Sequence, residues 1–325
     1  MPVTPSRWCS TTPDVTLITA GDPRRRTGGN LYDRHMLAAL RRAGLRVTTV
    51  VLADRRDAER LGKVRARVVL VDTIAAALTL PHLAGLRARG CEIIALAHMR
   101  HGAMSLARRA DRVIAVSRAL ADELVAGGVD RRTIVVVSPG RERLETRHDD
   151  PGRTILCVAN WTPAKGIHTL IAAVARLPEV TLELVGDMPD PLYAARVRRA
   201  IASSGLAARV RVHGTLGRSA VRRRYAAASV FALPSIREGY PIVLVEALAH
   251  GLPIVACDIP AVREVTGGAA VLVAPRRVKP FEAAIRELLA DERVRRAVGR
   301  QAQVRARSLP TWAESEARFL RAMRT

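Results

Sequence analysis

The sequence predicts a two-domain α/β protein in which each domain is built on a doubly wound parallel sheet. Short runs of β-branched and aliphatic residues alternate with helix-length segments along most of the 325 residues, as in consecutive right-handed βαβ units. The alternation stops once, in the polar stretch at residues 138–152, and restarts at Thr154. We therefore expect one domain over residues 1–150 and a second over residues 151–325, with a linker at about 138–152, each close to the ordinary size of a domain.

Six strands are expected in each half of the chain. Each is a continuous apolar run, which is typical of strands buried on both faces of a parallel sheet. The first series covers Val15–Thr19, Arg46–Leu52, Val68–Val71, Ile93–Leu96, Val113–Val116 and Ile134–Val137. The second series covers Ile155–Val158, Thr181–Val185, Val210–Val212, Val230–Leu233, Ile254–Ala256 and Val271–Val273.

Helix-length segments separate these runs, among them Leu31–Ala43, His168–Arg176 and Pro191–Ser203. Asp190 is a good N-cap for the last of these, Pro191 suits its first position, and Gly205 ends it. The tail Trp312–Thr325 also has a helical pattern, and we expect this last helix to pack back on the first domain.

The chain is strongly basic, with a formal net charge of +23, and arginine supplies nearly all of it because only Lys63, Lys165 and Lys279 are lysines. Two interpretations stay open: an anionic partner, such as a nucleotide diphosphate or a membrane surface, or a coding bias toward arginine. Specific nucleic-acid binding is disfavoured, because single strands stack on aromatic side chains and aromatic residues make up 3% of the chain.

The four cysteines are Cys9, Cys91, Cys157 and Cys257, and they form no CxxC pair. The last three lie in or beside apolar runs, which predicts buried, reduced thiols in a cytoplasmic protein rather than disulfides or a zinc site. The N-terminal residues have no long apolar core, which argues against a signal peptide.

The segment from Pro234 to Gly251 carries the clearest site signal. An apolar strand leads into a loop with Gly239 and Pro241, and the loop leads into a helix; ligands of open α/β sheets bind at this edge. Glu238 lies in the loop and Glu246 in the second helical turn. Backbone N–H groups around Gly239 and Ile242 are expected to point outward and to favour an anion.

This segment, EGYPIVLVE followed by ALAHGLPIVACDIPAVRE, closely resembles the donor site of glycosyltransferase family 4, the retaining enzymes of GT-B fold. The resemblance implies two Rossmann-like domains that face each other across a cleft. It also implies that the first glutamate and the amides after it hold the donor sugar, and that the second glutamate holds the ribose hydroxyls. These roles fall on Glu238, on Gly239, Tyr240, Pro241 and Ile242, and on Glu246.

A second segment, Asn160-Trp-Thr-Pro-Ala-Lys165-Gly166, follows the first strand of the second domain. A compact ammonium group beside a glycine at the start of a helix suits a diphosphate. In the resembling family an arginine five positions before this lysine binds the diphosphate as well. Asn160 stands there in this sequence, which puts the second phosphate contact in doubt.

Two segments of the first domain are weaker candidates. Gly28 and Gly29 form a turn ahead of a helix, and the family places such a loop against the donor phosphate. His98 follows a predicted strand, and in related enzymes a histidine at this place contacts the donor sugar near the reaction centre. Arg100 and His101 are candidates for acceptor or phosphate contacts.

In the second domain, Gly214 and Leu216 resemble the turn that contacts the nucleotide base. A DxD triplet is absent from the sequence, which predicts a site that needs no metal ion and no cofactor beyond the donor. The resemblance therefore implies a retaining transferase, with His98, Lys165 and Glu238 as its catalytic residues. The acceptor is a hydroxyl compound, lipid-linked or small, and peripheral association with the inner membrane face fits the basic charge.

Three alternatives are weighed against this interpretation. Another GT-B chemistry, an epimerase or a phosphorylase, would need grouped carboxylates or a longer chain with a cofactor lysine. A scaffold that has lost catalysis is favoured by Asn160. A basic protein that binds nucleic acid or a membrane surface would bind with a steep salt dependence and would be indifferent to nucleotide sugars.

Overall fold

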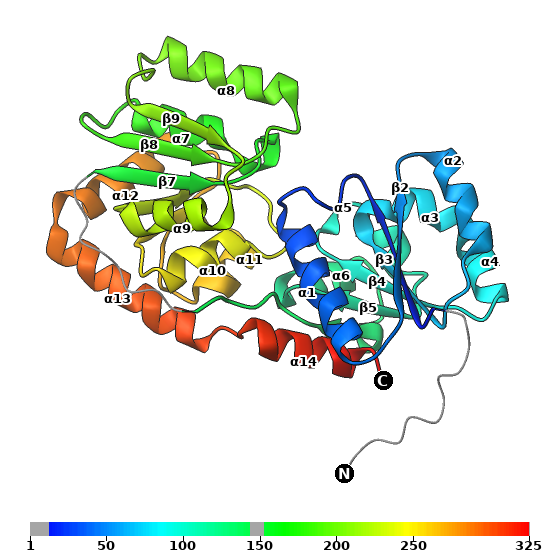
Figure 1. The fold of residues 1–325 in the computed structure, drawn as a ribbon. Coiled ribbons are helices and arrows are strands. Elements are labelled where there is room, and N and C mark those ends of the chain that lie inside the picture. Colours follow the sequence, from blue (N-terminus) through cyan, green and yellow to red (C-terminus); the bar gives the residue numbers. More distant parts are fainter. Residues whose placement is uncertain (1–12, 144–152, 325) are drawn as a thin grey trace. The chain divides into compact units, whose positions relative to one another are not determined.

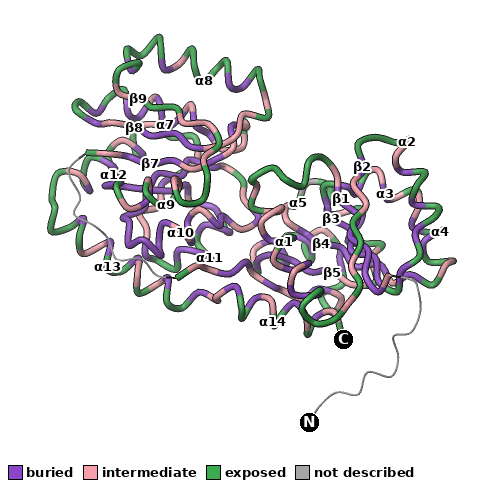
Figure 2. Tube along the Cα trace, in the orientation of Figure 1, coloured by how far each residue is buried: buried purple, intermediate pink, exposed green. Residues whose placement is uncertain are grey.

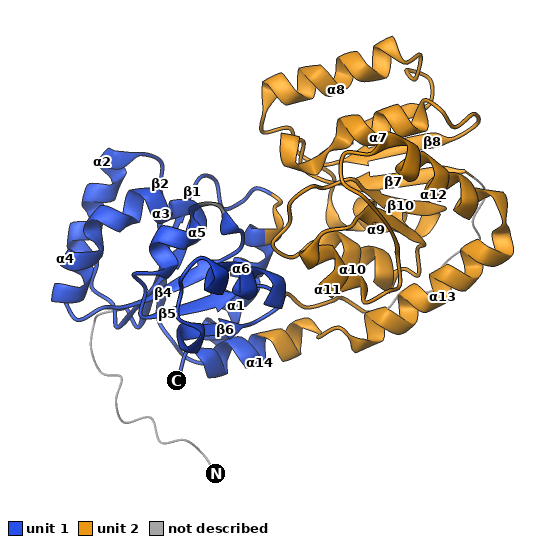
Figure 3. Cartoon of the chain, turned by 180° about the vertical axis from the view of Figure 1, so that it is seen from behind, with its two compact units in different colours: residues 1–25, 29–138, 316–325 blue, residues 26–28, 139–315 orange. Residues whose placement is uncertain are grey.

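The computed structural model describes residues 13–143 and 153–324, and these form two compact units, each with its own parallel sheet (Figures 1 and 3). Unit 1 comprises the chain up to Arg25, Gly29–Ser138 and the stretch from Glu316 onward. Unit 2 comprises Arg26–Gly28 and Pro139–Ser315. Most of the expected linker, residues 144–152, lies outside the described residues, as does Cys9.

The sheet of unit 1 has the strand order β2-β1-β3-β4-β5-β6, and neighbouring strands are parallel. Its strands are β1 (Val15–Ala20), β2 (Val47–Leu52), β3 (Val68–Asp72), β4 (Glu92–Ala97), β5 (Arg112–Ala115) and β6 (Ile134–Val136). Helices connect them: α1 (Gly28–Arg42), α2 (Arg55–Ala58), α3 (Ala76–Thr79), α4 (Leu83–Ala88), α5 (Arg100–Ala107) and α6 (Arg118–Ala126). Short 3₁₀ turns are η1 (Glu59–Lys63), η2 (Thr73–Ala75), η3 (Leu80–His82) and η4 (Arg131–Thr133).

The sheet of unit 2 has the order β12-β11-β10-β7-β8-β9, and it is also parallel throughout. Its strands are β7 (Thr154–Val158), β8 (Thr181–Val185), β9 (Val210–Gly214), β10 (Val230–Leu233), β11 (Ile254–Cys257) and β12 (Val271–Val273). The helices are α7 (Ile167–Val174), α8 (Pro191–Ser203), α9 (Arg218–Ala227), α10 (Ile242–Ala249), α11 (Pro260–Thr266), α12 (Val278–Ala290) and α13 (Glu292–Ser308), with the 3₁₀ turn η5 (Pro163–Lys165). Helix α7 packs on α8 and α12, whereas α10 packs on α11 and α13.

Burial follows the position of each strand in its sheet (Figure 2). Central strands such as β3 and β10 are buried along their whole length, as the continuous apolar runs predict. The edge strand β2 exposes Thr48 and Thr49, and the edge strand β9 exposes Arg211 and Val212. The core is mostly aliphatic, and Cys91, Cys157 and Cys257 lie within it as free thiols.

The chain ends in helix α14 (Trp312–Ala322), whose residues from Glu316 onward belong to unit 1. The ring of Phe319 is fully buried and meets Tyr32 edge to face at 6.4 Å between centroids. A carboxylate oxygen of Glu316 lies 2.9 Å from Nδ1 of His35. An apolar contact and a polar pair therefore hold the end of the chain against α1.

All twelve strands lie within two residues of their expected positions, and the fold class is confirmed. Helix α8 has the expected bounds, with the Asp190 carboxylate accepting a hydrogen bond from the Tyr193 N–H at 2.9 Å. Helix α1 begins at Gly28, three residues before the expected start at Leu31. The apolar pattern marks only where this helix becomes buried, so its polar first turn was not visible in the sequence.

Candidate functional site

The sheet of unit 2 has a topological switch point between β7 and β10. From β7 the chain adds β8 and β9 on one side, and from β10 it adds β11 and β12 on the other side. Loops after two such strands diverge and leave room for a ligand. Here the loops meet at their base, where the Ile236 N–H donates to the Ala164 carbonyl at 2.8 Å. Gly166 has φ 62°, and a Cβ there would lie 2.3 Å from the Pro234 carbonyl oxygen, so the contact requires glycine.

Lys165 and Glu238 face each other from these two loops. The Nζ atom of Lys165 lies 2.7 Å and 2.8 Å from the two carboxylate oxygens of Glu238. The glutamate side chain is 6% exposed and the lysine side chain 26% exposed. An ammonium group has three donors, and the carboxylate occupies two, which leaves one N–H for a ligand on the open side.

The turn between Glu238 and α10 differs from the expectation of free, outward amides. The Ile242 N–H donates to the Tyr240 carbonyl at 3.0 Å, so the expectation that this amide is free is wrong, while a contact of Ile242 with a donor stays a prediction. Pro241 is the N-cap of α10, one residue before the helix, and Gly239 is buried. The Tyr240 hydroxyl is buried and finds no hydrogen-bond partner within the described part of the chain.

Glu246 lies in the second turn of α10, and Tyr225 of α9 holds it. The tyrosine hydroxyl donates to the glutamate carboxylate at 2.9 Å. The tyrosine ring is buried and stacks on His250 at 5.0 Å between centroids. Burial raises the pKa of Glu246 to about 7, although the hydrogen bond from Tyr225 acts to lower it. This carboxyl group therefore changes its charge close to neutral pH.

The remaining residues that the sequence singled out in unit 2 have structural contacts. The side-chain oxygen of Asn160 accepts a hydrogen bond from the Asp187 N–H at 3.1 Å, which ties the loop after β7 to the loop after β8. Gly214 ends β9 with φ 63°, and its carbonyl accepts from the Gly186 N–H at 2.9 Å. Leu216 packs half-buried against the core. Their contacts with a donor stay predictions.

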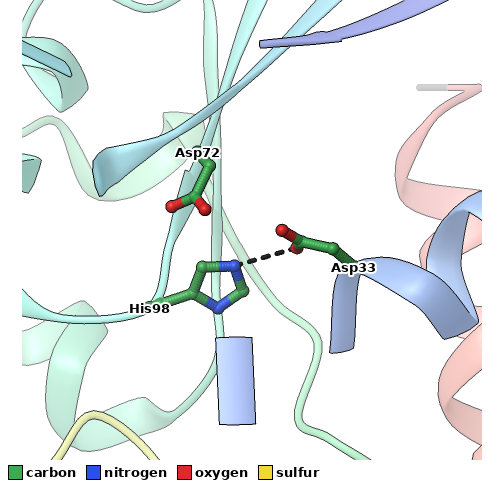
Figure 4. A group of neighbouring side chains, drawn as sticks. All are labelled: Asp33, Asp72 and His98. Atoms are coloured by element: carbon green, nitrogen blue, oxygen red, sulfur yellow. Dashed lines mark hydrogen bonds and ion pairs between the residues drawn. The ribbon is translucent and has the colours of Figure 1, made fainter. Parts of the chain in front are cut away.

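Unit 1 carries its own polar cluster at the carboxyl edge of its sheet (Figure 4). Asp72 ends β3, His98 directly follows β4, and Asp33 lies on α1, which follows β1. The sheet reverses its order of growth between β1 and β3, so this is also a ligand-binding edge. The Nε2 atom of His98 lies 2.9 Å from a carboxylate oxygen of Asp33.

The two carboxylates decide the charge of His98. Burial opposes a charged imidazole, but the attraction of Asp33, its hydrogen bond and the charge of Asp72 together raise the pKa of His98 to about 9. Burial in turn raises the pKa of Asp72. The imidazole is therefore protonated at neutral pH, and both of its nitrogens are hydrogen-bond donors.

The same three residues offer ligand atoms within 4.8 Å of one another. A protonated imidazole has no lone pair for a metal ion and repels one. In this protonation state Asp33, Asp72 and His98 form a charged hydrogen-bond network.

Gly28 and Gly29 are the first two residues of α1, rather than a turn ahead of it, which corrects the expected loop. A Cβ on Gly29 would lie 3.5 Å from the His98 ring, an ordinary van der Waals contact, so the start of the helix lies beside this imidazole. Arg100 and His101 are the first two residues of α5.

Three residues of these sites were missed by sequence reasoning: Tyr225, Asp33 and Asp72. Asp72 had a weak signal, because it interrupts an apolar run at the end of a strand, where buried carboxylates mark ligand edges. Tyr225 and Asp33 lie on helices far from their partners in the sequence, and no local pattern predicts these pairings. Among the described residues, no helix combines the length and the apolar character needed to cross a membrane.

Comparisons with known proteins bear on the family and the fold of the chain. Residues 140–305 match the family described as Glycosyl transferases group 1. The MMP alpha-(1->4)-mannosyltransferase of Mycolicibacterium hassiacum is 29% identical over 217 residues, which cover 64% of this chain and 52% of the relative. The lipopolysaccharide core biosynthesis glycosyltransferase LpsE of Rhizobium meliloti is 35% identical over 120 residues, which cover 37% of this chain and 33% of the relative. The chain thus spans about half or less of these relatives.

Solved structures agree over a longer stretch. Sucrose-phosphate synthase from Thermosynechococcus elongatus matches with a TM-score of 0.83 at 19% identity, covering 95% of this chain and 98% of that one. At this identity the likeness shows the fold, and it confirms the GT-B class that the sequence predicts.

Proposed function

Because the chain belongs to the glycosyl transferases group 1 family, we propose that it is a retaining, metal-independent glycosyltransferase. It moves a sugar from a nucleotide-diphosphate sugar to a hydroxyl acceptor. The observation that carries this proposal is the pair Lys165 and Glu238 at the reversal point of the second sheet, with Glu246 eight residues further on. Names of relatives such as the mannosyltransferase of M. hassiacum support a sugar donor.

Each residue of unit 2 has a role that its chemistry suits. The unused N–H of Lys165 points a positive charge at the diphosphate, and it stabilises the negative charge that develops as the diphosphate leaves. Glu238 accepts hydrogen bonds from sugar hydroxyls while it keeps this lysine in place. Glu246, when ionised, accepts hydrogen bonds from two ribose hydroxyls. Gly239 and Tyr240 line the turn beside the sugar.

Unit 1 supplies the acceptor side and His98. Since the imidazole is charged at neutral pH, its role is that of a hydrogen-bond donor to a sugar or phosphate oxygen rather than that of a general base. Asp33 is a positioning residue, which holds the ring and its proton. Attack of the acceptor hydroxyl on the face from which the diphosphate leaves would retain the anomeric configuration, and this stereochemistry comes from the family.

A ligand panel tests the donor site. Thermal stability is measured against UDP, GDP, ADP and their sugar conjugates, without metal, for the wild type, Lys165→Ala and the control Lys63→Ala. Lys63 is an exposed lysine of unit 1. A ligand at about 100 times its dissociation constant adds about 2.7 kcal/mol to the free energy of unfolding. We expect one nucleotide series to stabilise the wild type and Lys63→Ala but not Lys165→Ala. Stabilisation by none of these ligands would contradict the proposal.

A further inference from the structure

Unit 2 contains a hollow that the proposed donor site does not use. Its volume is about 280 Å³, and it lies at the start of α7, beside α8 and the loops after β10 and β12. Three arginines from three different elements line it, together with His168: Arg196 of α8, Arg237 of the loop after β10, and Arg276 of the loop after β12.

Lys165 and Glu238 do not line this hollow. The hollow nevertheless shares both loops with them, because Ala164 and Gly166 line it on either side of Lys165, and Arg237 precedes Glu238. It is therefore a neighbouring site that shares both loops with the donor pair.

The charge of these three arginines is not balanced by an ion pair within the described part of the chain. None of the described acidic residues forms a salt bridge with Arg196, Arg237 or Arg276. Other arginines of the same unit do have such partners: Arg286 pairs with Glu282 at 2.5 Å, and Arg176 pairs with the same carboxylate at 3.4 Å. The hollow is therefore lined by three arginine charges that form no ion pair with the described residues.

His168 lines the same hollow, and the neighbouring arginines affect its pKa. Burial lowers the pKa of His168, and the charges of Arg196 and Arg276 lower it further. Its Nδ1 atom lies 3.0 Å from the Tyr193 hydroxyl, which fixes the ring. The histidine is then a neutral group with its other nitrogen available, beside cations that form no ion pair with the described residues.

The backbone conformation of Arg276 also favours a role for this arginine at the hollow. This residue has φ 62°, one of two positive values among the described residues other than glycine. Glycine adopts this conformation without the steric cost that a side chain adds. The chain keeps an arginine there, and this arginine lines the hollow.

We propose that this hollow is an anion site, separate from the donor pair, that binds a phosphate group, either free or as a terminal monoester. Guanidinium groups present paired N–H donors that match phosphate oxygens. Three of them from separate elements surround a tetrahedral dianion better than they surround a chloride ion. A phosphate bound here links α8 to both loops that carry Lys165 and Glu238.

Calorimetric titration with inorganic phosphate and with glycerol 3-phosphate, at constant ionic strength set by sodium chloride, tests the site. The key variant is Arg276→Gly, which removes one cation and relieves the backbone, so it should fold at least as well as the wild type. The matched control is Arg199→Gln, an exposed arginine on the same helix as Arg196. Lys165→Ala is the control for the donor site.

We expect the dissociation constant for phosphate to rise about tenfold in Arg276→Gly and in Arg196→Gln, since a charge-assisted hydrogen bond is lost. It should stay unchanged in Arg199→Gln and Lys165→Ala. Tighter binding of the monoester than of free phosphate would identify a phosphorylated metabolite as the ligand class, and the reverse order would identify the free ion. Equal binding by Arg276→Gly and the wild type would overturn the proposal. A tenfold loss in Lys165→Ala alone would also overturn it, because the phosphate would then occupy the donor site.

Discussion

Each of the two sheets carries a cationic side chain at the topological switch point of its strands. The two sites differ in how many carboxylates surround that cation. In unit 2 one ammonium group meets one carboxylate, and the lysine is 26% exposed. In unit 1 one imidazole meets two carboxylates, and its side chain is 13% exposed. A balanced and partly open pair can share its cation with an incoming anion. A buried cation beside two carboxylates keeps its proton and stays charged at neutral pH.

This difference suits Lys165 and His98 to different chemical roles. Lys165 has a free donor and solvent access, so it can bind a ligand without breaking its pair with Glu238. His98 holds its proton against the solvent, so it can donate a hydrogen bond but cannot take a proton from an acceptor. The predictions below test this contrast, from the largest expected effect to the smallest.

The geometry of the unit 2 edge depends on the contact between its two loops. Gly166→Ala should lower the free energy of unfolding by about 3 kcal/mol, because a Cβ would clash with the Pro234 carbonyl in addition to the unfavourable φ. Gly205→Ala is the matched control: it has φ 66° but no atom within 4 Å of its Cβ, and it should cost about 1 kcal/mol. Urea unfolding measures both, and equal losses would show that the loop contact is unimportant.

The raised pKa of His98 in unit 1 predicts that the free energy of unfolding depends on pH. The pKa of His98 is raised from 6.5 to about 9, so its contribution is fully present below pH 6.5 and is lost as the pH rises to about 9. The free energy of unfolding should fall by about 3 kcal/mol over this window, at about 1.36 kcal/mol for each pKa unit. In Asp33→Asn the slope between pH 6.5 and 9 should be much smaller. Equal slopes of the free energy of unfolding against pH in the wild type and Asp33→Asn would show that Asp33 does not keep His98 protonated.

The shared cation in unit 2 predicts a loss of nucleotide affinity. Lys165→Ala should raise the dissociation constant for the nucleoside diphosphate about 10- to 100-fold, since a charge-assisted contact is lost. Lys165→Arg should recover only part of this affinity, because a planar guanidinium cannot fit both Glu238 and the phosphate in the same way. Calorimetry measures the three constants, and full affinity in Lys165→Ala would place the diphosphate elsewhere.

The smallest effect concerns the hydrogen bond between Tyr225 and Glu246. Below pH 7 the carboxyl group is protonated and accepts ribose hydroxyls poorly, so nucleotide affinity should increase between pH 6 and pH 8 with a midpoint at about 7. Tyr225→Phe removes a bond that lowers this pKa, so the midpoint should move upward and affinity at pH 7 should fall a few-fold. Glu246→Gln should bind weakly without this pH dependence. An unshifted midpoint in Tyr225→Phe would show that the bond does not control the carboxyl group.

The fold could be predicted from the sequence because buried parallel strands leave uninterrupted apolar runs, such as Val230–Leu233 and Ile254–Cys257. The positions of Lys165, Glu238 and Glu246 could be predicted because each follows or lies near such a strand within one local segment, and their contacts with a donor stay predictions. The pairing of Tyr225 with Glu246 and of Asp33 with His98 depends on how helices far apart in the chain pack together. The amide of Ile242 shows a further limit, since its bond to Tyr240 depends on the local turn.

The measurement that tests the account most directly is the release of nucleoside diphosphate from the nucleotide sugar that stabilises the protein best, without metal, by the wild type, Lys165→Ala and Lys63→Ala. Slow hydrolysis of the donor needs the site of unit 2 and no knowledge of the acceptor. The account predicts release by the wild type and Lys63→Ala and a loss of about 100-fold or more in Lys165→Ala. Equal release by Lys165→Ala and the wild type, or none by any of the three, would contradict the claim that this chain is a transferase that uses Lys165.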